Sequence, residues 1–193
     1  MNMLFSLGVE PEDLPDIPGL SYRPNSITEQ EESALAAAID AEPWDVSWER
    51  RRQPYGASYG KSGSPSPPIP TWGRQLADRI KNEGLTQQAF DQMLVNEYLP
   101  GQGIALHRDY EPFDRTVASL SLLAPCVMQF HHVASGRRAE LLLERRSLIV
   151  LTDEARYDWE HGIARRKNDV WQGVKLPRSR RVSITFRSLR RSA

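Results

Sequence analysis

From Met93 onward the chain alternates short apolar segments with turn residues, and this pattern restricts the possible folds more than any other feature. Breaks such as Pro125 and Ser135-Gly136 keep the segments shorter than typical helices. Strands are expected at residues 93–98, 104–109, 117–123, 127–133, 139–143, 148–152, near His161, and at 182–186. About eight short strands separated by turns favour an antiparallel double-sheet jelly roll. We therefore predict an α+β chain with a mainly β core.

The N-terminal part of the chain has a different character. Residues 1–25 are expected to form an irregular arm, because prolines recur through them. A first helix is predicted to begin at the capping box formed by Thr28 and Glu31, and a second to span about residues 72–83. Both helices are expected to buttress the sheet. The residues 60–70, rich in Pro, Ser and Gly, are predicted to form a mobile loop.

A length of 193 residues is enough for one domain with its own core. The single cysteine, Cys126, excludes a disulfide framework. No apolar run approaches the roughly 20 residues that cross a bilayer, and residues 1–15 lack the basic start and apolar core of a signal peptide. We therefore expect a cytoplasmic monomer with no membrane association.

The 25 basic and 25 acidic residues balance overall but are unevenly distributed. Residues 1–50 contain 11 acidic residues and only Arg23 and Arg50 as basic ones, so the rest of the chain carries net positive charge. Arginine clusters in that part are suited to face phosphate groups, although any single cluster is more simply explained as solvated surface.

A candidate metal site is present in the same region. In an extended strand His107 and Asp109 point to one face, and His161 follows 54 residues later on another strand. Two imidazoles and one carboxylate can occupy one face of an Fe(II) ion and leave its other positions open. The His-x-Asp triplet alone is weak evidence, because acidic residues are common in this chain.

A second candidate site lies on the segment from Arg181 to Arg187, where polar and apolar residues alternate strictly. This period of two predicts a strand with two unlike faces. The two arginines would lie about 20 Å apart at roughly 3.3 Å per residue, so they could hold opposite ends of a short dicarboxylate. The alternative is a solvated face on an edge strand.

Further motifs accompany these two. They are Asn96 and Tyr98, the segment from Gly101 to Asp109, His161-Gly162-Ile163, and the segment from Arg181 to Arg187. In order and spacing they resemble the AlkB-type branch of the Fe(II)/2-oxoglutarate dioxygenases, whose motifs read Asn-x-Tyr, Gly-x-x-Ile-x-x-His-x-Asp, His-Gly-Ile and Arg-x5-Arg. Four motifs in the right order make coincidence improbable.

The resemblance implies a double-stranded β-helix core at about residues 90–190, within a single dioxygenase domain of residues 26–193. A substrate-covering lid is implied at about residues 50–70. The metal is expected to be Fe(II), with 2-oxoglutarate and O2 as co-substrates, and its ligands are expected to be His107, Asp109 and His161. In such enzymes 2-oxoglutarate is converted to succinate and carbon dioxide while a substrate C–H bond is hydroxylated, and a hydroxylated N-methyl group is lost as formaldehyde.

For 2-oxoglutarate the resemblance implies a salt bridge from Arg181 to the distal carboxylate, with Tyr98 donating a hydrogen bond to the same end. Arg187 and Asn96 would serve the end nearer the metal. Ser183 stands where the nucleic-acid demethylases of the family usually have asparagine. Because its hydroxyl is shorter than an amide, the contact there is expected to be lost or bridged by water.

Substrate contacts are expected from Glu111, Tyr55, Tyr59 and Trp159. Glu111 lies two places after Asp109, where DNA-repair members have an acidic residue that reads the flipped base. The three aromatic residues are candidates to stack on a base. A surface role for Glu111 and a packing role for each aromatic ring are the alternatives.

The resulting hypothesis is oxidative dealkylation of alkylated nucleobases in DNA or RNA, as in DNA repair, on single-stranded or locally melted substrates. Residues 152–163 are more similar to the family's tRNA-modifying branch, so the alternative is a hydroxylase of a modified tRNA base, a protein or a small molecule. A jelly-roll binding protein with a vestigial metal site is a third possibility, against which the intact ligand set and both arginines argue.

Overall fold

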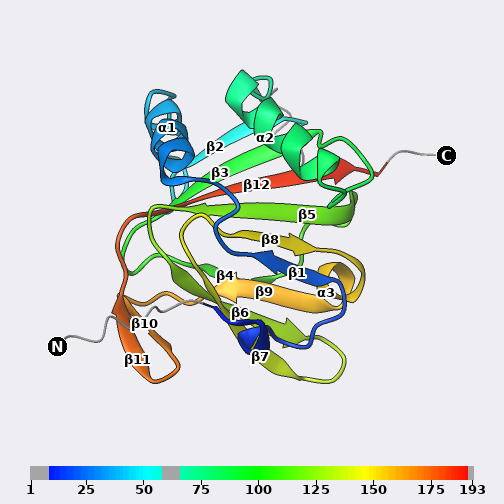
Figure 1. The fold of residues 1–193 in the computed structure, drawn as a ribbon, viewed down its shortest axis with the longest axis vertical. Coiled ribbons are helices and arrows are strands. Elements are labelled where there is room, and N and C mark those ends of the chain that lie inside the picture. Colours follow the sequence, from blue (N-terminus) through cyan, green and yellow to red (C-terminus); the bar gives the residue numbers. More distant parts are fainter. Residues whose placement is uncertain (1–8, 58–65, 191–193) are drawn as a thin grey trace.

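The computed structural model describes residues 9–57 and 66–190, to which the statements below refer. Two antiparallel sheets lie face to face, and two helices cover the outer face of the larger one (Figure 1). The larger sheet has the order β1 (Leu20–Arg23), β8 (Leu148–Leu151), β5 (Phe113–Leu122), β12 (Arg181–Leu189), β3 (Gln92–Tyr98) and β2 (Arg52–Gly56). The smaller sheet has the order β4 (Ile104–His107), β9 (Trp159–Ile163), β6 (Cys126–His132) and β7 (Arg138–Leu143).

The remaining elements are short. Strands β10 (Asn168–Trp171) and β11 (Val174–Pro177) form a separate hairpin. The helical segments are η1 (Pro11–Asp13), α1 (Glu29–Asp40), α2 (Thr71–Asn82) and α3 (Asp153–Tyr157). None of these helices has the length and apolar character that a bilayer crossing requires.

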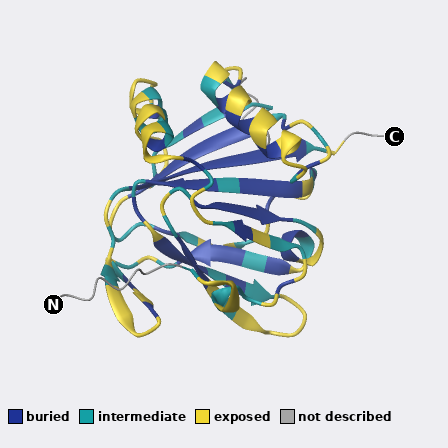
Figure 2. Ribbon diagram, in the orientation of Figure 1, coloured by how far each residue is buried: buried dark blue, intermediate teal, exposed yellow. Residues whose placement is uncertain are grey.

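The predicted helices form where the sequence indicates. At the start of α1 the Glu31 backbone N–H donates to Thr28 Oγ1 at 3.1 Å, and the Thr28 N–H donates to Glu31 Oε2 at 2.8 Å. Helix α1 buries Ile39, and α2 buries Leu76 and Ile80, in a core shared with the outer face of the larger sheet. Their other faces are exposed (Figure 2). The expectation that N-terminal helices buttress the sheet is confirmed.

The jelly-roll prediction is confirmed, with corrections to individual elements. Residues 9–25 are not wholly irregular, because residues 20–23 form β1 and pair with β8. Residues 52–56 of the expected lid form β2, an edge strand of the larger sheet. Proline has no backbone N–H to donate to a neighbouring strand, so Pro54 is tolerated at an edge, where one side of the strand has no neighbour. The 60–70 loop and the lid fall partly outside the described residues. Strands β10 and β11 and helix α3 were not foreseen.

Strand β12 lies between β5 and β3, and both of its faces are buried. Val182, Ile184 and Phe186 pack in the core beneath the helices. The opposite face, which begins at Arg181 and ends at Arg187, is turned toward the smaller sheet and lines a cavity. The prediction of two unlike faces is therefore confirmed, and the alternative of a solvated edge strand is wrong.

Close contact between β4 and β9 depends on Gly103. A Cβ atom at Gly103 would lie 2.2 Å from the Ile163 carbonyl oxygen, so Gly103→Ala must push the two strands apart. We expect the free energy of unfolding to fall by about 1–3 kcal/mol, the usual cost of overpacking, in urea denaturation. Gly136→Asn is the control, because a Cβ there meets nothing within 4 Å and asparagine tolerates the positive φ. Equal unfolding free energies in the two variants would contradict this account.

Candidate metal and co-substrate site

A cavity of about 900 Å³ lies between the two sheets. The larger sheet contributes alternate residues of β12, β3 and β5 to its wall. The smaller sheet contributes residues of β4, β6 and β9, and the segment of residues 45–57 borders it as well. Polar groups from strands far apart in the sequence therefore converge on one space.

The predicted metal ligands meet at one end of this cavity. His107 and His161 are directly opposite each other in the pairing of β4 with β9, with their ring centroids 4.6 Å apart. Asp109 follows the end of β4, and its Oδ2 lies 3.5 Å from His161 Nε2. The expectation that His161 comes from a second strand holds, while Asp109 lies just beyond the strand that was predicted to include it.

The donor atoms suit a metal ion. The buried Oδ2 of Asp109 has no hydrogen-bond partner in the described residues. His107 Nδ1 lies 2.9 Å from the Ala105 carbonyl oxygen, so with the proton on Nδ1 the other ring nitrogen is left as a ligand. As they stand, no three His, Cys, Asp or Glu side chains in the described part of the chain form a metal-holding group.

The electrostatic surroundings keep Asp109 and His161, the two buried predicted ligands, in the protonation states that bind metals. Burial alone would raise the pKa of Asp109, but the Arg187 guanidinium, together with His161 and His107, lowers it to about 2. Burial lowers the pKa of His161 to about 4, and attraction to Asp109 offsets only part of that effect. At neutral pH the carboxylate is therefore ionised and the imidazole neutral, as metal binding requires.

Arg187 has a role that the sequence did not reveal. Its Nε donates to Asp109 Oδ1 at 2.5 Å, and its Nη1 donates to Gln92 Oε1 at 3.1 Å. The resemblance predicts that Arg187 serves the metal-proximal end of 2-oxoglutarate. In the structure it also holds the predicted metal ligand Asp109 in place.

Arg156 supports the same loop from behind. It is buried at the end of α3, and its guanidinium donates to the carbonyl oxygens of Asp109, Tyr110 and Phe113 at 3.0–3.3 Å. These bonds fix the backbone that leaves β4. Arg156 belongs to residues 152–163, which resemble the tRNA-modifying branch, and only the three-dimensional structure shows what it contacts.

The other end of the cavity suits an anion. Arg181 and Tyr98 are opposite each other in the pairing of β12 with β3, and the guanidinium carbon lies 5.3 Å from the ring centroid. Arg181 Nη2 donates to Ser121 Oγ at 2.7 Å, while its buried Nε has no partner in the described residues. Burial raises the pKa of Tyr98, which keeps its hydroxyl protonated as a donor. This pair could hold a carboxylate.

Ser183 and Asn96 also pair across β12 and β3, and both line the cavity. The Asn96 Oδ1 accepts a hydrogen bond from Arg50 Nε at 3.3 Å. Next to Ser183, Ser119 and Thr185 place their hydroxyl oxygens 3.1 Å apart. Arg50, Ser119 and Thr185 were not foreseen, although the alternation along β12 already placed Thr185 on the polar face.

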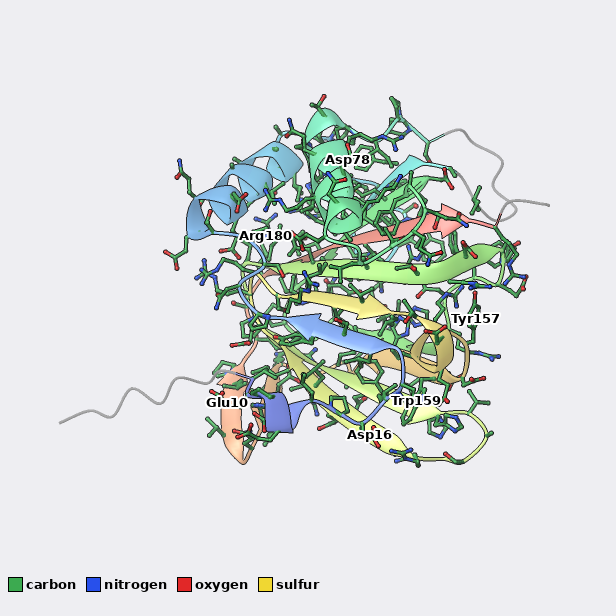
Figure 3. All side chains as sticks on the ribbon, turned by 45° about the vertical axis from the view of Figure 1, so that its right-hand side comes forward. Glu10, Asp16, Asp78, Tyr157, Trp159 and Arg180 are labelled. Atoms are coloured by element: carbon green, nitrogen blue, oxygen red, sulfur yellow. The ribbon has the colours of Figure 1, made fainter. Side chains whose placement is uncertain are left out.

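The residues predicted to contact substrate lie elsewhere. Trp159, labelled in Figure 3, is 1% exposed and packs against His132 with ring centroids 5.1 Å apart. Tyr55 is 5% exposed and packs edge-on against Trp72. Their burial does not fit the expected stacking on a base, because neither ring lines the cavity.

Glu111 is exposed and pairs with Arg190 at 2.8 Å on the surface, outside the cavity wall. Its position therefore does not fit the expected contact with a base in the cavity. Tyr59 lies outside the described residues.

Two other aromatic residues border the cavity. Trp48 is 58% exposed and Tyr110 is 50% exposed, and both contribute to its lining. Arg52 lies over the Trp48 ring at 4.4 Å from its centroid. No local pattern in the sequence separates these two rings from the buried ones, because exposure depends on the assembled fold.

Arg156→Met should destabilise the protein, because the variant keeps much of the side-chain length but loses the hydrogen bonds that the guanidinium donates to three carbonyl groups. We expect the free energy of unfolding to fall by about 2–3 kcal/mol in urea denaturation. Arg23→Met is the control, since Arg23 and Glu83 form an exposed pair, of a kind worth about 0–1 kcal/mol. A loss no larger than in the control would show that Arg156 does not brace the loop.

Comparisons with known proteins show which family this chain resembles. The sequence model of the 2OG-Fe(II) oxygenase superfamily matches residues 21–187. The Arabidopsis thaliana alkylated DNA repair protein ALKBH8 homolog is 35% identical over 205 residues, covering 91% of this chain and 59% of that protein. The Mus musculus tRNA (carboxymethyluridine(34)-5-O)-methyltransferase ALKBH8 is 35% identical over 140 residues, covering 64% of this chain and 21% of that protein.

The solved structure of OsALKBH1 has a TM-score of 0.68 and 19% identity, and the match covers 89% of this chain and 98% of that one. At this identity the likeness shows the fold, which is the predicted double-stranded β-helix. The chain spans about three fifths and one fifth of the two relatives above. The chain belongs to the 2OG-Fe(II) oxygenase superfamily, in its AlkB-type branch, whose members are dioxygenases that use Fe(II), 2-oxoglutarate and O2.

Proposed function

We propose that this protein hydroxylates an alkyl substituent on a nucleobase of single-stranded or locally melted nucleic acid. The observation that carries the proposal is one cavity with the His107, Asp109 and His161 side chains at one end, Arg181 at the other, and exposed aromatic rings beside it. The names of the two relatives refer to alkylated DNA and to tRNA, which supports a nucleic-acid substrate.

In this proposal His107, Asp109 and His161 hold Fe(II), and 2-oxoglutarate places its distal carboxylate on Arg181 and Tyr98. The bound metal and co-substrate supply the oxidising power, with succinate and carbon dioxide as by-products. The protein excludes water and fixes the geometry. If the hydroxylated carbon is attached to nitrogen, the product loses formaldehyde and the base is dealkylated.

The substrate base is proposed to stack on Trp48 or Tyr110. A base must leave its stack to enter such a cavity, which costs a few kcal/mol in a duplex and less in a single strand. An exposed aromatic ring compensates for the lost stacking by roughly 1–3 kcal/mol. The nucleic-acid partner, the monomeric state and the cytoplasmic location remain predictions.

The charges in the cavity favour a neutral substituent over a cationic methylated base. In the described residues its lining contains two carboxylates, Asp45 and Asp109. Asp45 accepts hydrogen bonds from Ser47 and Arg52, and Asp109 is held by Arg187. Asp45 is therefore engaged, the Oδ2 of Asp109 is proposed to bind the metal, and Glu111 lies outside the cavity. Repair of cationic lesions is therefore the second candidate.

Replacing any proposed metal ligand should abolish turnover. We expect purified protein with Fe(II) and ascorbate to convert 2-oxoglutarate slowly to succinate without a substrate, and His107→Ala, Asp109→Ala or His161→Ala to stop it by removing a ligand. Succinate release and iron binding would be measured together. His132→Ala is the control, since His132 lies outside the cavity and caps a hairpin turn through Ser135. A wild-type protein that neither binds iron nor forms succinate would favour the vestigial binding module.

A screen of methylated DNA and RNA oligonucleotides alongside tRNA should identify the substrate class. We expect turnover, followed by mass spectrometry and formaldehyde release, to be greater on neutral alkylated bases than on 1-methyladenine. Trp48→Ala should raise the substrate KM at least about fivefold, whereas Val46→Ala, at an even more exposed neighbour outside the cavity, should not. Substrate binding should weaken as salt rises. No turnover on any oligonucleotide, with no salt-dependent binding, would leave an oxygenase of another substrate.

A further inference from the structure

Arg50 connects the segment beside the cavity opening to the wall that is proposed to bind 2-oxoglutarate. It is half-buried, and its Nε donates to Asn96 Oδ1 at 3.3 Å. Its Nη1 donates to the Gly103 carbonyl oxygen at 3.0 Å, and its guanidinium carbon lies 5.2 Å from the centroid of the Tyr98 ring. Arg50 therefore contacts Asn96 and Tyr98 in the proposed co-substrate wall and Gly103 in the turn before β4.

The neighbouring arginines point to different partners. Arg51 pairs with Glu97 at 2.5 Å and lies over the Trp44 ring, away from the main cavity. Arg52 pairs with Asp45. In the described residues no carboxylate pairs with Arg50, so its contacts are to an amide, a carbonyl and a ring. These three contacts fix the positions of the groups around Arg50. Because none of the three partners is a carboxylate, the positive charge of Arg50 is not neutralised by them.

The orientation of Asn96 follows from this contact. An amide offers one acceptor oxygen and two donor hydrogens. Because Arg50 is a donor only, it can hold Asn96 only by the oxygen, which directs the amide nitrogen elsewhere. Asn96 lines the cavity, so its N–H groups are the part available to an anionic ligand there. Without Arg50 the amide could turn its oxygen toward that ligand and repel it.

We propose that Arg50 is a positioning residue for the co-substrate, acting through Asn96. The inference rests on the proposed function and adds a residue that strengthens the co-substrate site through its effect on Asn96.

A double-mutant cycle tests the proposal. The wild type, Arg50→Lys, Asn96→Ala and the double variant would be titrated anaerobically with 2-oxoglutarate in the presence of Fe(II), by calorimetry. Lysine keeps the positive charge but cannot hold the amide and the carbonyl together. Arg51→Lys is the matched control, and Arg181→Lys is the reference for direct loss of a carboxylate contact. Thermal unfolding of each variant reports on folding, and Arg50→Gln replaces Arg50→Lys if the latter does not fold.

We expect Arg50→Lys to weaken 2-oxoglutarate binding about five- to tenfold, to leave iron affinity unchanged, and to have no further effect once Asn96 is alanine. Arg51→Lys should bind 2-oxoglutarate as the wild type does. Equal 2-oxoglutarate affinity in Arg50→Lys and Arg51→Lys, or additive losses in the double variant, would overturn the proposal while leaving the proposed function intact. A wild type that does not bind 2-oxoglutarate would instead overturn the proposed function.

Discussion

The structure depends on the burial of a polar row along one face of β12. Arg181, Ser183, Thr185 and Arg187 are all buried, and an arginine is stable in such a place only where hydrogen bonds and charge replace lost water. Strand β12 can carry this row because Val182, Ile184 and Phe186 on its opposite face are apolar and pack beneath the helices. The result is a polar space enclosed by an apolar fold, where electrostatic attraction is stronger than in water.

The two arginines at the ends of this row differ in how their charge is compensated. Arg187 donates to the carboxylate of Asp109, so much of its charge is neutralised within the protein. Arg181 meets a hydroxyl and an aromatic ring, and no carboxylate of the described residues pairs with it. An anion entering the cavity is therefore drawn to the Arg181 end, and the Asp109 end retains a negative group for a cation. The polarity of the cavity is set before any ligand binds.

The sequence was sufficient for features that local patterns encode. Alternation predicted the two faces of β12, the capping box at Thr28 predicted the start of α1, and the order of the motifs predicted that His107 and His161 meet. The roles of Arg156 and Arg50 were not predictable, because their partners are backbone carbonyls and an amide supplied by distant segments. The same limit applies to aromatic rings, whose chemistry is identical whether the fold buries or exposes them.

Because strand β1 is part of the larger sheet, the folded unit includes residues that precede residue 26. Leu20–Arg23 pairs along β8 and so covers what would otherwise be the outer edge of the larger sheet. A chain that began at residue 26 would lack β1, and the backbone N–H and C=O groups along that edge of β8 would be unpaired. β8 is apolar throughout, and an uncovered apolar edge of this kind invites pairing between molecules. The first strand thus protects the protein against self-association as well as completing its sheet.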